Sequence, residues 1–315
     1  IIHILFSNLK ILKIVYYLKD IMSLNSFIEY LVKERNYSNN TIIAYKNDLN
    51  VFQNFCLKEF NHENLKKSNY SFIRSWIVSL VESGLSNRSI NRKISVLRSY
   101  FNFLLKIGEI DKSPLKNHKP LKEEKKIQVP FSEKEINSLL DGDFFKKDYE
   151  GTMIKTLIQL FYSTGLRLSE VTNLKNMSVD LVNKKIKVLG KRNKERIIPI
   201  IDSLMNQLLK FQELKKQIIS DPESEFFFVN EKNIKLKNIY VYKVVNLYLN
   251  KVSTKSKRSP HMLRHSFATH LLNRGADINS VKELLGHASL AATQIYTHSS
   301  MEKIKSIYKK SHPRN

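Results

Sequence analysis

Hydrophobic residues in the first third of the chain recur at the 3.6-residue spacing of α-helices. Four stretches carry this pattern, and they predict helices over residues 27–34, 41–60, 72–84 and 89–108. A capping box of Ser26 and Glu29 predicts the start of the first helix. Gly84 and Gly108 predict the ends of the third and fourth helices. Because such amphipathic helices bury one another, the pattern predicts a compact bundle.

The pattern breaks between Asp111 and Pro130 and then changes character. This stretch holds three prolines and many lysines, which is typical of an exposed linker. A capping box of Ser132 and Glu135 then predicts a new helix, and residues 151–165 predict another. The sequence therefore predicts two domains joined by a basic linker.

Short runs with β-type composition follow in the second region. Residues 184–190 and 195–200 predict a hairpin whose turn is residues 191–194. Residues 226–229, with the sequence FFFV, predict a third strand, and helices resume near residue 238. The second domain is therefore expected to be mostly helical with a small sheet.

The first 22 residues are apolar but interrupted by Lys10, Lys13 and Lys19. This composition does not fit a membrane span, and the segment lacks a small-residue cleavage site. The chain begins with Ile1 and its first methionine is Met22, so we interpret residues 1–22 as an upstream extension. Since no other segment fits a membrane span, we expect no membrane partner and a cytoplasmic location.

Charge points toward a polyanionic partner. The 315 residues include 53 basic and 29 acidic ones, giving a net charge of +24 and a pI near 9.8. Nucleic acid is the first candidate for such a partner, although lysine excess from an AT-rich genome is the alternative. The single cysteine, Cys56, lies in an apolar helical pattern and is interpreted as a buried hydrophobic residue.

Arg167 is the first residue that suggests chemistry, because it lies between Leu166 and Leu168 in an apolar run. An arginine in such surroundings either pairs with a carboxylate or binds an anion. Glu170, three residues on, is the candidate carboxylate. Both interpretations stay open at this point.

A second cluster occurs in the sequence HMLRHSFATHLL, where His261, Arg264 and His265 have helical spacing. The two histidines suggest zinc, but a zincin motif has Glu after its first histidine and Met262 stands there. No cysteine pair or further carboxylate completes a ligand set, so we expect no metal. Imidazole and guanidinium groups together suit a phosphate.

Three further positions are unremarkable when taken alone. His287 follows a glycine at a predicted helix end, Tyr296 lies nine residues later, and Lys191 lies in the predicted hairpin turn. A packing tyrosine and a solvated turn lysine are the ordinary interpretations of the last two. Their value comes from their order along the chain.

That order resembles the tyrosine recombinases of the phage integrase family. The six residues Arg167, Lys191, His261, Arg264, His287 and Tyr296 stand in the family's order. The phrases STGLRLSE, GKRNKER, HMLRHSFATHLL and LLGHASLAATQIYTH resemble the bacterial XerC and XerD type, and the likeness extends from about Met22 to the end. Arg192 departs from the pattern because the family often has glycine there, which puts the reach of Lys191 in doubt.

The resemblance implies a mainly α-helical protein. Its expected parts are a probable extension over residues 1–22, a four-helix, SAM-like core-binding domain over residues 23–111, a linker over residues 112–130, and an α+β catalytic domain with a small antiparallel sheet over residues 131–315. It also implies a cutting and rejoining reaction through a 3′-phosphotyrosyl intermediate that needs no cofactor, metal or ATP. Tyr296 is then the nucleophile, and His261 assists its deprotonation. Arg167 and Arg264 neutralise the non-bridging oxygens, and His287 adds a hydrogen bond to the phosphate. Lys191 is the general acid for the departing 5′ oxygen.

The implied partners are double-stranded DNA with a short palindromic core site and a homo- or hetero-tetramer, with a DNA translocase as a further candidate. The basic positions expected on DNA are Arg88, Arg92, Lys93, Arg98 and Arg192. Residues 301–310 resemble the segment by which family protomers dock onto a neighbour.

The preferred role is Xer-like resolution of chromosome dimers. The alternatives are a mobile-element integrase or transposase, a type IB topoisomerase, and a non-catalytic DNA-binding protein on the same scaffold.

Overall fold

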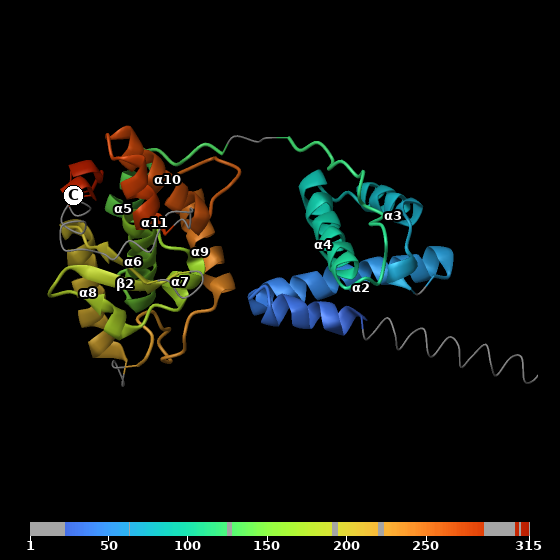
Figure 1. Cartoon of the computed structure of the whole chain (residues 1–315). Coiled ribbons are helices and arrows are strands. Elements are labelled where there is room, and N and C mark those ends of the chain that lie inside the picture. Colours follow the sequence, from blue (N-terminus) through green and yellow to red (C-terminus); the bar gives the residue numbers. More distant parts are fainter. Residues whose placement is uncertain are drawn as a thin grey trace, which may run out of the picture. The chain divides into compact units, whose positions relative to one another are not determined.

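A computed structural model describes residues 23–62, 64–124, 128–190, 195–219, 224–286, 306–308 and 310–314. The chain divides into two compact units, Ile1–Lys126 and Ile127–Asn315 (Figure 1). The mainly helical fold with one small antiparallel sheet, predicted from the sequence, is confirmed.

The first unit is a helical bundle. Its elements are a helix over residues 23–33, α2 (Asn39–Phe60), the short 3-10 helix η1 (Leu65–Lys67), α3 (Tyr70–Glu82) and α4 (Asn87–Lys106). The four predicted helices are thus confirmed. The capping box at Ser26 is wrong, because residues 23–25 are already helical and Ser26 lies inside the helix.

Aromatic side chains from separate helices fill the core of this bundle. Phe27, Phe52, Trp76 and Tyr100 are almost fully buried. The rings of Phe52 and Trp76 have centroids 4.8 Å apart, and Phe27 meets Tyr100 edge-on at 5.3 Å. Cys56 is buried in the same cluster, as predicted. Burial of these large rings stabilises the bundle.

The second unit is built around α6 (Tyr149–Thr164), which is buried almost along its whole length. Figure 1 shows this helix in the middle of the unit, and it contacts α8 (Asp202–Ile218), α9 (Asn238–Asn250) and α10 (Pro260–Asn273). The remaining elements are α5 (Glu133–Asp141), α7 (Leu168–Thr172), the 3-10 helix η2 (Asn176–Ser178) and α11 (Ile278–Leu285). The capping box of Ser132 and Glu135 is confirmed at the start of α5.

The sheet has three antiparallel strands in the order β1 (Val179–Asp180), β2 (Lys185–Leu189) and β3 (Glu195–Pro199). The predicted hairpin is confirmed, with Val188 opposite Arg196. The predicted third strand over residues 226–229 is wrong, since Phe226 and Val229 form only isolated bridges. Residues 227–229 are buried one after another, so they lack the alternating exposure of a strand beside solvent.

The end of the chain packs on the core of its own unit. Tyr308 is 1% exposed, and its hydroxyl donates a hydrogen bond to the Ser163 carbonyl. The Arg314 guanidinium pairs with Asp141 at 2.8 Å, and the Ser203 hydroxyl donates to the Arg314 carbonyl. In this chain alone, the described part of the tail is therefore an intramolecular contact, whereas docking onto a neighbour stays a prediction.

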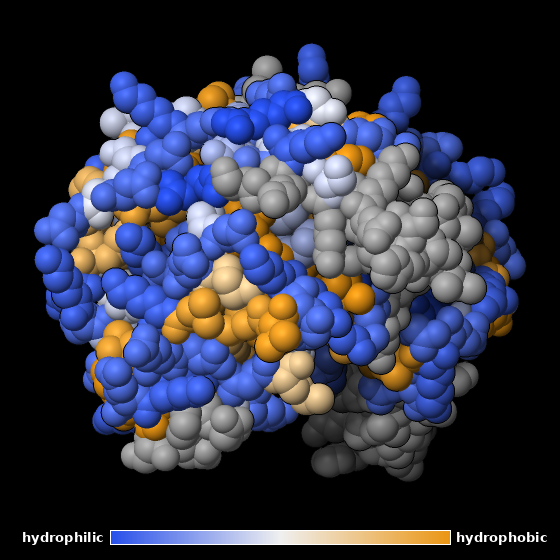
Figure 2. All heavy atoms as spheres, turned by 90° about the vertical axis from the view of Figure 1, so that its left-hand side faces the viewer, coloured by the Kyte–Doolittle hydropathy of each residue, from blue (hydrophilic) through white to orange (hydrophobic). Residues whose placement is uncertain are grey.

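Within the described ranges, no helix combines the length and the apolar character that a membrane crossing requires. The face shown in Figure 2 is mostly hydrophilic, with small separate patches of hydrophobic side chains.

Candidate active site

Arg167 is positioned by the start of α7, where it is the residue that precedes the helix. Its backbone N–H donates to Glu170 Oε2 at 2.7 Å, and its Nη1 donates to Glu170 Oε1 at 2.8 Å. Its Nη2 donates to the Gly286 carbonyl at 3.2 Å. The side chain remains 28% exposed. Arg167 thus pairs with a carboxylate and still reaches solvent, so both interpretations of this residue remain compatible with the geometry.

Arg264 lies on α10, whose start is fixed by the Ser259 cap and by Pro260 in the first turn. Its Nη1 donates to the Gly165 carbonyl at 2.5 Å and its Nη2 to the Leu285 carbonyl at 2.7 Å. Burial, followed by the charge of Arg167, lowers the pKa of Arg264 to about 10. The guanidinium therefore keeps its positive charge at neutral pH.

The two arginines converge on one backbone feature, the C-terminal end of α11. Arg264 binds the carbonyl of Leu285 and Arg167 binds the carbonyl of Gly286, the next residue. Carbonyls at the end of a helix are left without helical partners and carry partial negative charge. This end of α11 therefore binds two guanidinium groups through successive carbonyls.

Glycine is required at the end of α6, which approaches the same place. Gly165 has φ +62°, the left-handed region that favours glycine. A Cβ there would lie 2.7 Å from the side chains of Leu285 and Phe267. The close packing of α6 against α10 and α11 thus depends on the missing side chain, and it places the Gly165 carbonyl on Arg264.

His261 is exposed at the start of α10. Partial burial of the ring, and then the charge of Arg264, lower the pKa of His261, which favours a neutral ring that accepts a proton. His265 has another partner, since its Nε2 lies 3.2 Å from the Gln128 carbonyl. Of the predicted cluster, His261 is therefore the open imidazole and Arg264 the buried cation.

Arg196 on β3 is a member of the site that the sequence reasoning missed. It is 4% exposed, and its Nη1 and Nη2 donate to Glu170 Oε1 and Oε2 at 2.9 and 2.8 Å. The signal was present in the strand pattern, because Arg196 shares a strand face with buried Ile198. A charged residue at such an inward position requires a buried partner.

Four predicted positions, Lys191, Arg192, His287 and Tyr296, lie outside the described residues. The described part reaches Gly190 and Glu195 on either side of the hairpin turn, and it reaches Gly286 at the end of α11. In that part of the chain, no group of three or more His, Cys, Asp or Glu side chains is arranged to hold a metal ion.

The basic residues predicted on α4 differ in their surroundings. Asp48, which is 4% exposed, accepts from Arg92 at 2.6 and 3.1 Å and from Lys93 at 2.7 Å. Arg98 donates to the His118 carbonyl at 3.1 Å. Arg88 and Arg92 are exposed, whereas Lys93 and Arg98 are half-buried. The two exposed arginines lie four residues apart on α4, and Arg92 is paired with buried Asp48.

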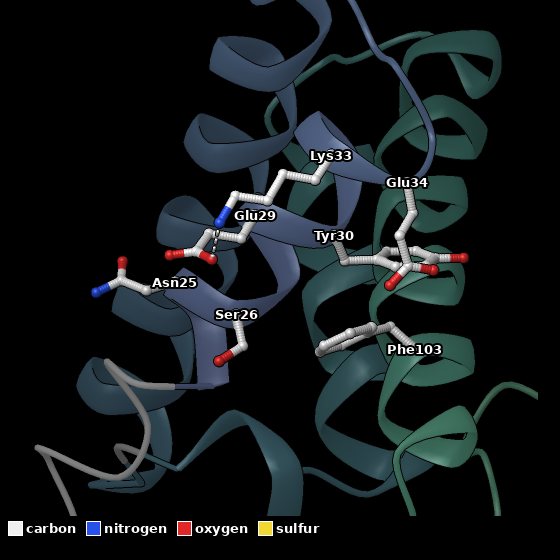
Figure 3. A pocket seen from close by; sticks show the side chains of 7 residues that line it. All are labelled: Asn25, Ser26, Glu29, Tyr30, Lys33, Glu34 and Phe103. Carbon is white, nitrogen blue, oxygen red and sulfur yellow. Dashed lines mark hydrogen bonds and ion pairs between the residues drawn. The ribbon is translucent and has the colours of Figure 1, made fainter.

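Two pockets occur away from this cluster. One, of about 400 Å³, lies in the first unit beside the rings of Tyr30 and Phe103, with the Glu29–Lys33 ion pair on its wall (Figure 3). The other, of about 510 Å³, lies between the start of α6 and α8. Neither is lined by a described residue of the predicted catalytic set, so the arginine cluster remains the candidate site.

Comparison with protein families gives two matches that together cover most of the chain. The model described as phage integrase family matches residues 131–303. The model described as phage integrase, N-terminal SAM-like domain, matches residues 24–108.

Comparison with individual proteins gives relatives of similar length. The tyrosine recombinase XerC of Chlorobaculum tepidum is 34% identical, over 92% of this chain and 94% of that protein. The tyrosine recombinase XerD of Staphylococcus epidermidis is 33% identical, over 92% and 98%. A structure of the XerH site-specific recombinase bound to its palindromic difH substrate is 25% identical, with a TM-score of 0.69 over 93% of this chain and 87% of that one. The Tn1549 transposon integrase shares the fold, with a TM-score of 0.69 at 18% identity over 90% and 99%.

Proposed function

Because the chain belongs to the phage integrase family, as a tyrosine recombinase of the XerC/XerD type, we propose that it cuts and rejoins DNA through Tyr296. The family predicted from the sequence is confirmed, and membership makes the chain a DNA strand-transferase. The proposal concerns which residues do the chemistry and on what DNA.

The observation that carries the proposal is the meeting of Arg167 and Arg264 at the end of α11. Two guanidinium groups fixed by backbone carbonyls form a rigid receptor for the non-bridging oxygens of a phosphodiester. Attack on phosphorus concentrates negative charge on those oxygens. The two positive groups therefore stabilise the transition state more than the ground state. His261 lies on the same helix as Arg264, three residues before it.

We assign the remaining roles to the other residues of the set. The Tyr296 hydroxyl oxygen bonds to phosphorus, and its proton passes to His261. The bond from phosphorus to the 5′ oxygen breaks, and Lys191 protonates that oxygen as it leaves. His287 donates a hydrogen bond to the phosphate. A 5′ hydroxyl from another strand then gives its proton to Lys191 and bonds to phosphorus, while the bond to the Tyr296 oxygen breaks and His261 returns a proton to that oxygen. Each step therefore exchanges one phosphoester for another and requires neither ATP nor a metal.

The DNA partner is proposed to be a short palindromic duplex, bound by both units. Support comes from the charge of +24 and from the XerH relative, whose structure holds a palindromic substrate. Recombination between two duplexes cuts four strands and so requires four active sites. We therefore propose a tetramer, made of this chain alone or with a related recombinase. The preferred biological role is resolution of chromosome dimers in the cytoplasm, with a DNA translocase as activator.

A nicked suicide substrate tests the nucleophile. Duplexes with palindromic cores, selected from a random library by binding to this chain, are nicked near the scissile phosphate and incubated with the full-length protein. The wild type should form a covalent adduct that survives a denaturing gel. Tyr296→Phe should bind the duplex equally well and form no adduct.

The matched control is Tyr242→Phe, which makes the same chemical change at a tyrosine that is 43% exposed on α9. This variant should form the adduct at the wild-type rate. An adduct that persists in Tyr296→Phe would falsify the assignment of the nucleophile.

A further inference from the structure

Arg196 is a buried cation that the proposed chemistry does not use. It lies on β3, on the strand that leaves the hairpin turn, and is 4% exposed. Burial of a guanidinium is costly unless its N–H donors find hydrogen-bond acceptors and its charge is compensated. The partners of Arg196 are therefore informative about its role.

Those partners belong to two other elements of the site. Both oxygens of Glu170 on α7 accept from Arg196, at 2.9 and 2.8 Å, and the Leu284 carbonyl of α11 accepts from its Nε at 3.0 Å. A Cβ on Gly286 would lie 3.1 Å from the Arg196 side chain, so this side chain packs directly against Gly286 at the end of α11. One guanidinium thus ties β3, α7 and the end of α11 together.

Glu170 is shared between Arg196 and Arg167. It accepts two hydrogen bonds from Arg196, one from the Arg167 backbone and one from the Arg167 side chain. The negative charge of Glu170 also acts to raise the pKa of Arg264. The carboxyl is almost fully buried, and the hydrogen bonds from Arg196 and Arg167 hold its pKa at about 2 although burial acts in the opposite direction.

The charge balance explains why a second arginine is needed. With Arg167 as its main partner, the carboxylate would neutralise the cation that is meant for the phosphate. Because Arg196 neutralises Glu170 through one bidentate pair of hydrogen bonds, the charge of Arg167 remains available to an external anion. Glu170 then serves to orient Arg167 rather than to cancel it.

We infer that Arg196 is a positioning residue for DNA cleavage, which compensates the charge of Glu170 and fixes the C-terminal end of α11, so that Arg167 and Arg264 face the scissile phosphate. This inference rests on the proposed function, since it concerns the same phosphate site. Arg196 also connects β3 to Glu170 and to the end of α11, which are the groups that hold Arg167 and Arg264.

The test compares three variants of the full-length protein. Arg196→Met removes the charge and the donors while keeping a long side chain. Arg196→Lys keeps the charge but loses the two-pronged geometry. The double variant of Arg196→Met with Glu170→Gln removes the charge of both partners, which is the change best tolerated at a buried pair. Lys187→Met is the matched control, since it removes an exposed ion pair with Glu195 from the same hairpin.

The readouts are single-turnover adduct formation on the nicked duplex, binding of that duplex, and the dependence of the cleavage rate on pH. We expect Arg196→Met to slow cleavage roughly tenfold to a hundredfold at neutral pH, with binding close to wild type. Arg196→Lys should be intermediate, and Lys187→Met should be unchanged.

The pH profile separates positioning from a general loss of structure. Without Arg196, burial should raise the pKa of Glu170, and its protonation as the pH drops from about 8 to 5 should stop it from cancelling the charge of Arg167. The cleavage defect of Arg196→Met relative to wild type should therefore shrink over that range. The described charged groups that act on this carboxyl are Arg196 and Arg167, and Arg264 is coupled to it through its charge. The double variant should lose the added pH dependence, because Glu170 is the group that titrates.

Cleavage by Arg196→Met at the wild-type rate, with an unchanged pH profile, would overturn the inference. Should that variant fail to fold, Arg196→Lys decides, and wild-type rate and profile in Arg196→Lys overturn the inference equally. An added pH dependence that persists in the double variant would also overturn it. The wild-type adduct and its loss in Tyr296→Phe are measured in the same assay, so failure of the proposed function is seen separately.

Discussion

Substitution of Gly165 by alanine tests the packing that brings the two arginines together. Gly165 has φ +62°, and a left-handed conformation costs a residue with a side chain roughly 1–2 kcal/mol. The new methyl group would also stand 2.7 Å from Leu285 and Phe267. Overpacking of this kind costs about 1–3 kcal/mol. We therefore expect Gly165→Ala to lower the free energy of unfolding of the second unit by about 2–5 kcal/mol.

Gly275→Ala isolates the steric part of that loss. Gly275 lies in the same unit and has φ +83°, yet a Cβ there would meet nothing within 4 Å. Both variants carry the conformational cost, so their difference measures the crowding between α6, α10 and α11. We expect that difference to be about 1–3 kcal/mol.

Urea titration followed by two probes gives the measurement. Helical circular dichroism reports both units, whereas fluorescence of Trp76, the single tryptophan, reports the first unit. The transition seen by Trp76 should not move in either variant. Equal losses in Gly165→Ala and Gly275→Ala would refute the steric reasoning, and adduct formation should fall more in Gly165→Ala because the Gly165 carbonyl holds Arg264.

Three further predictions concern charge and titration. Arg88→Ala should weaken DNA binding for every sequence and reduce the slope of log affinity against log salt by about one, as measured by fluorescence anisotropy; an unchanged slope would place Arg88 away from phosphate. Asp48→Asn should lower the free energy of unfolding of the first unit by roughly 1–3 kcal/mol, seen by Trp76, because buried Asp48 accepts from Arg92 and Lys93; no shift would show that the pairs add no stability. Burial lowers the pKa of His312 to about 3 in the folded protein, against about 6.5 when unfolded. The free energy of unfolding of the second unit should therefore fall by about 2 kcal/mol between neutral pH and pH 5. It should fall less in His312→Phe, and an equal fall in both proteins would exclude His312 as the source.

The sign of the His312 effect follows from proton binding. Between its folded and unfolded pKa values the unfolded chain binds the extra proton, so the stability is present above about pH 6.5 and is lost as the pH falls toward 3. The ring stays neutral at ordinary pH, with Nδ1 accepting from the Arg314 N–H at 3.1 Å.

Local signals in the sequence predicted most of the helices. The glycine after α6 and the one after α11 both have positive φ, as helix ends with C-terminal glycine require. The capping box failed at Ser26 because a serine with a glutamate three residues on also occurs within a helix. The strand predicted over residues 226–229 is wrong because a run of apolar residues indicates burial but does not determine whether the backbone forms a strand.

The candidate site was predictable in its members but not in its connections. Arg167, His261 and Arg264 follow from motif spacing, and Glu170 follows from its place three residues after Arg167. Arg196 pairs with Glu170 across 26 residues of sequence, and such a pair forms only when β3 packs beside α7. Likewise, no sequence pattern states that the carbonyls of Gly165, Leu285 and Gly286 face the two arginines.

The end of α11 has a consequence for the reading of mutational scans. It holds the arginines through carbonyl oxygens of Leu284, Leu285 and Gly286, which every amino acid possesses. At Leu284, replacement by another apolar side chain of similar volume leaves that contact intact, so tolerance there would conceal its importance. Gly286, with φ +64° and Arg196 3.1 Å from its missing Cβ, would register as intolerant. A scan would therefore detect this contact through substitutions of Gly286, although Gly286 has no side chain that could take part in the chemistry.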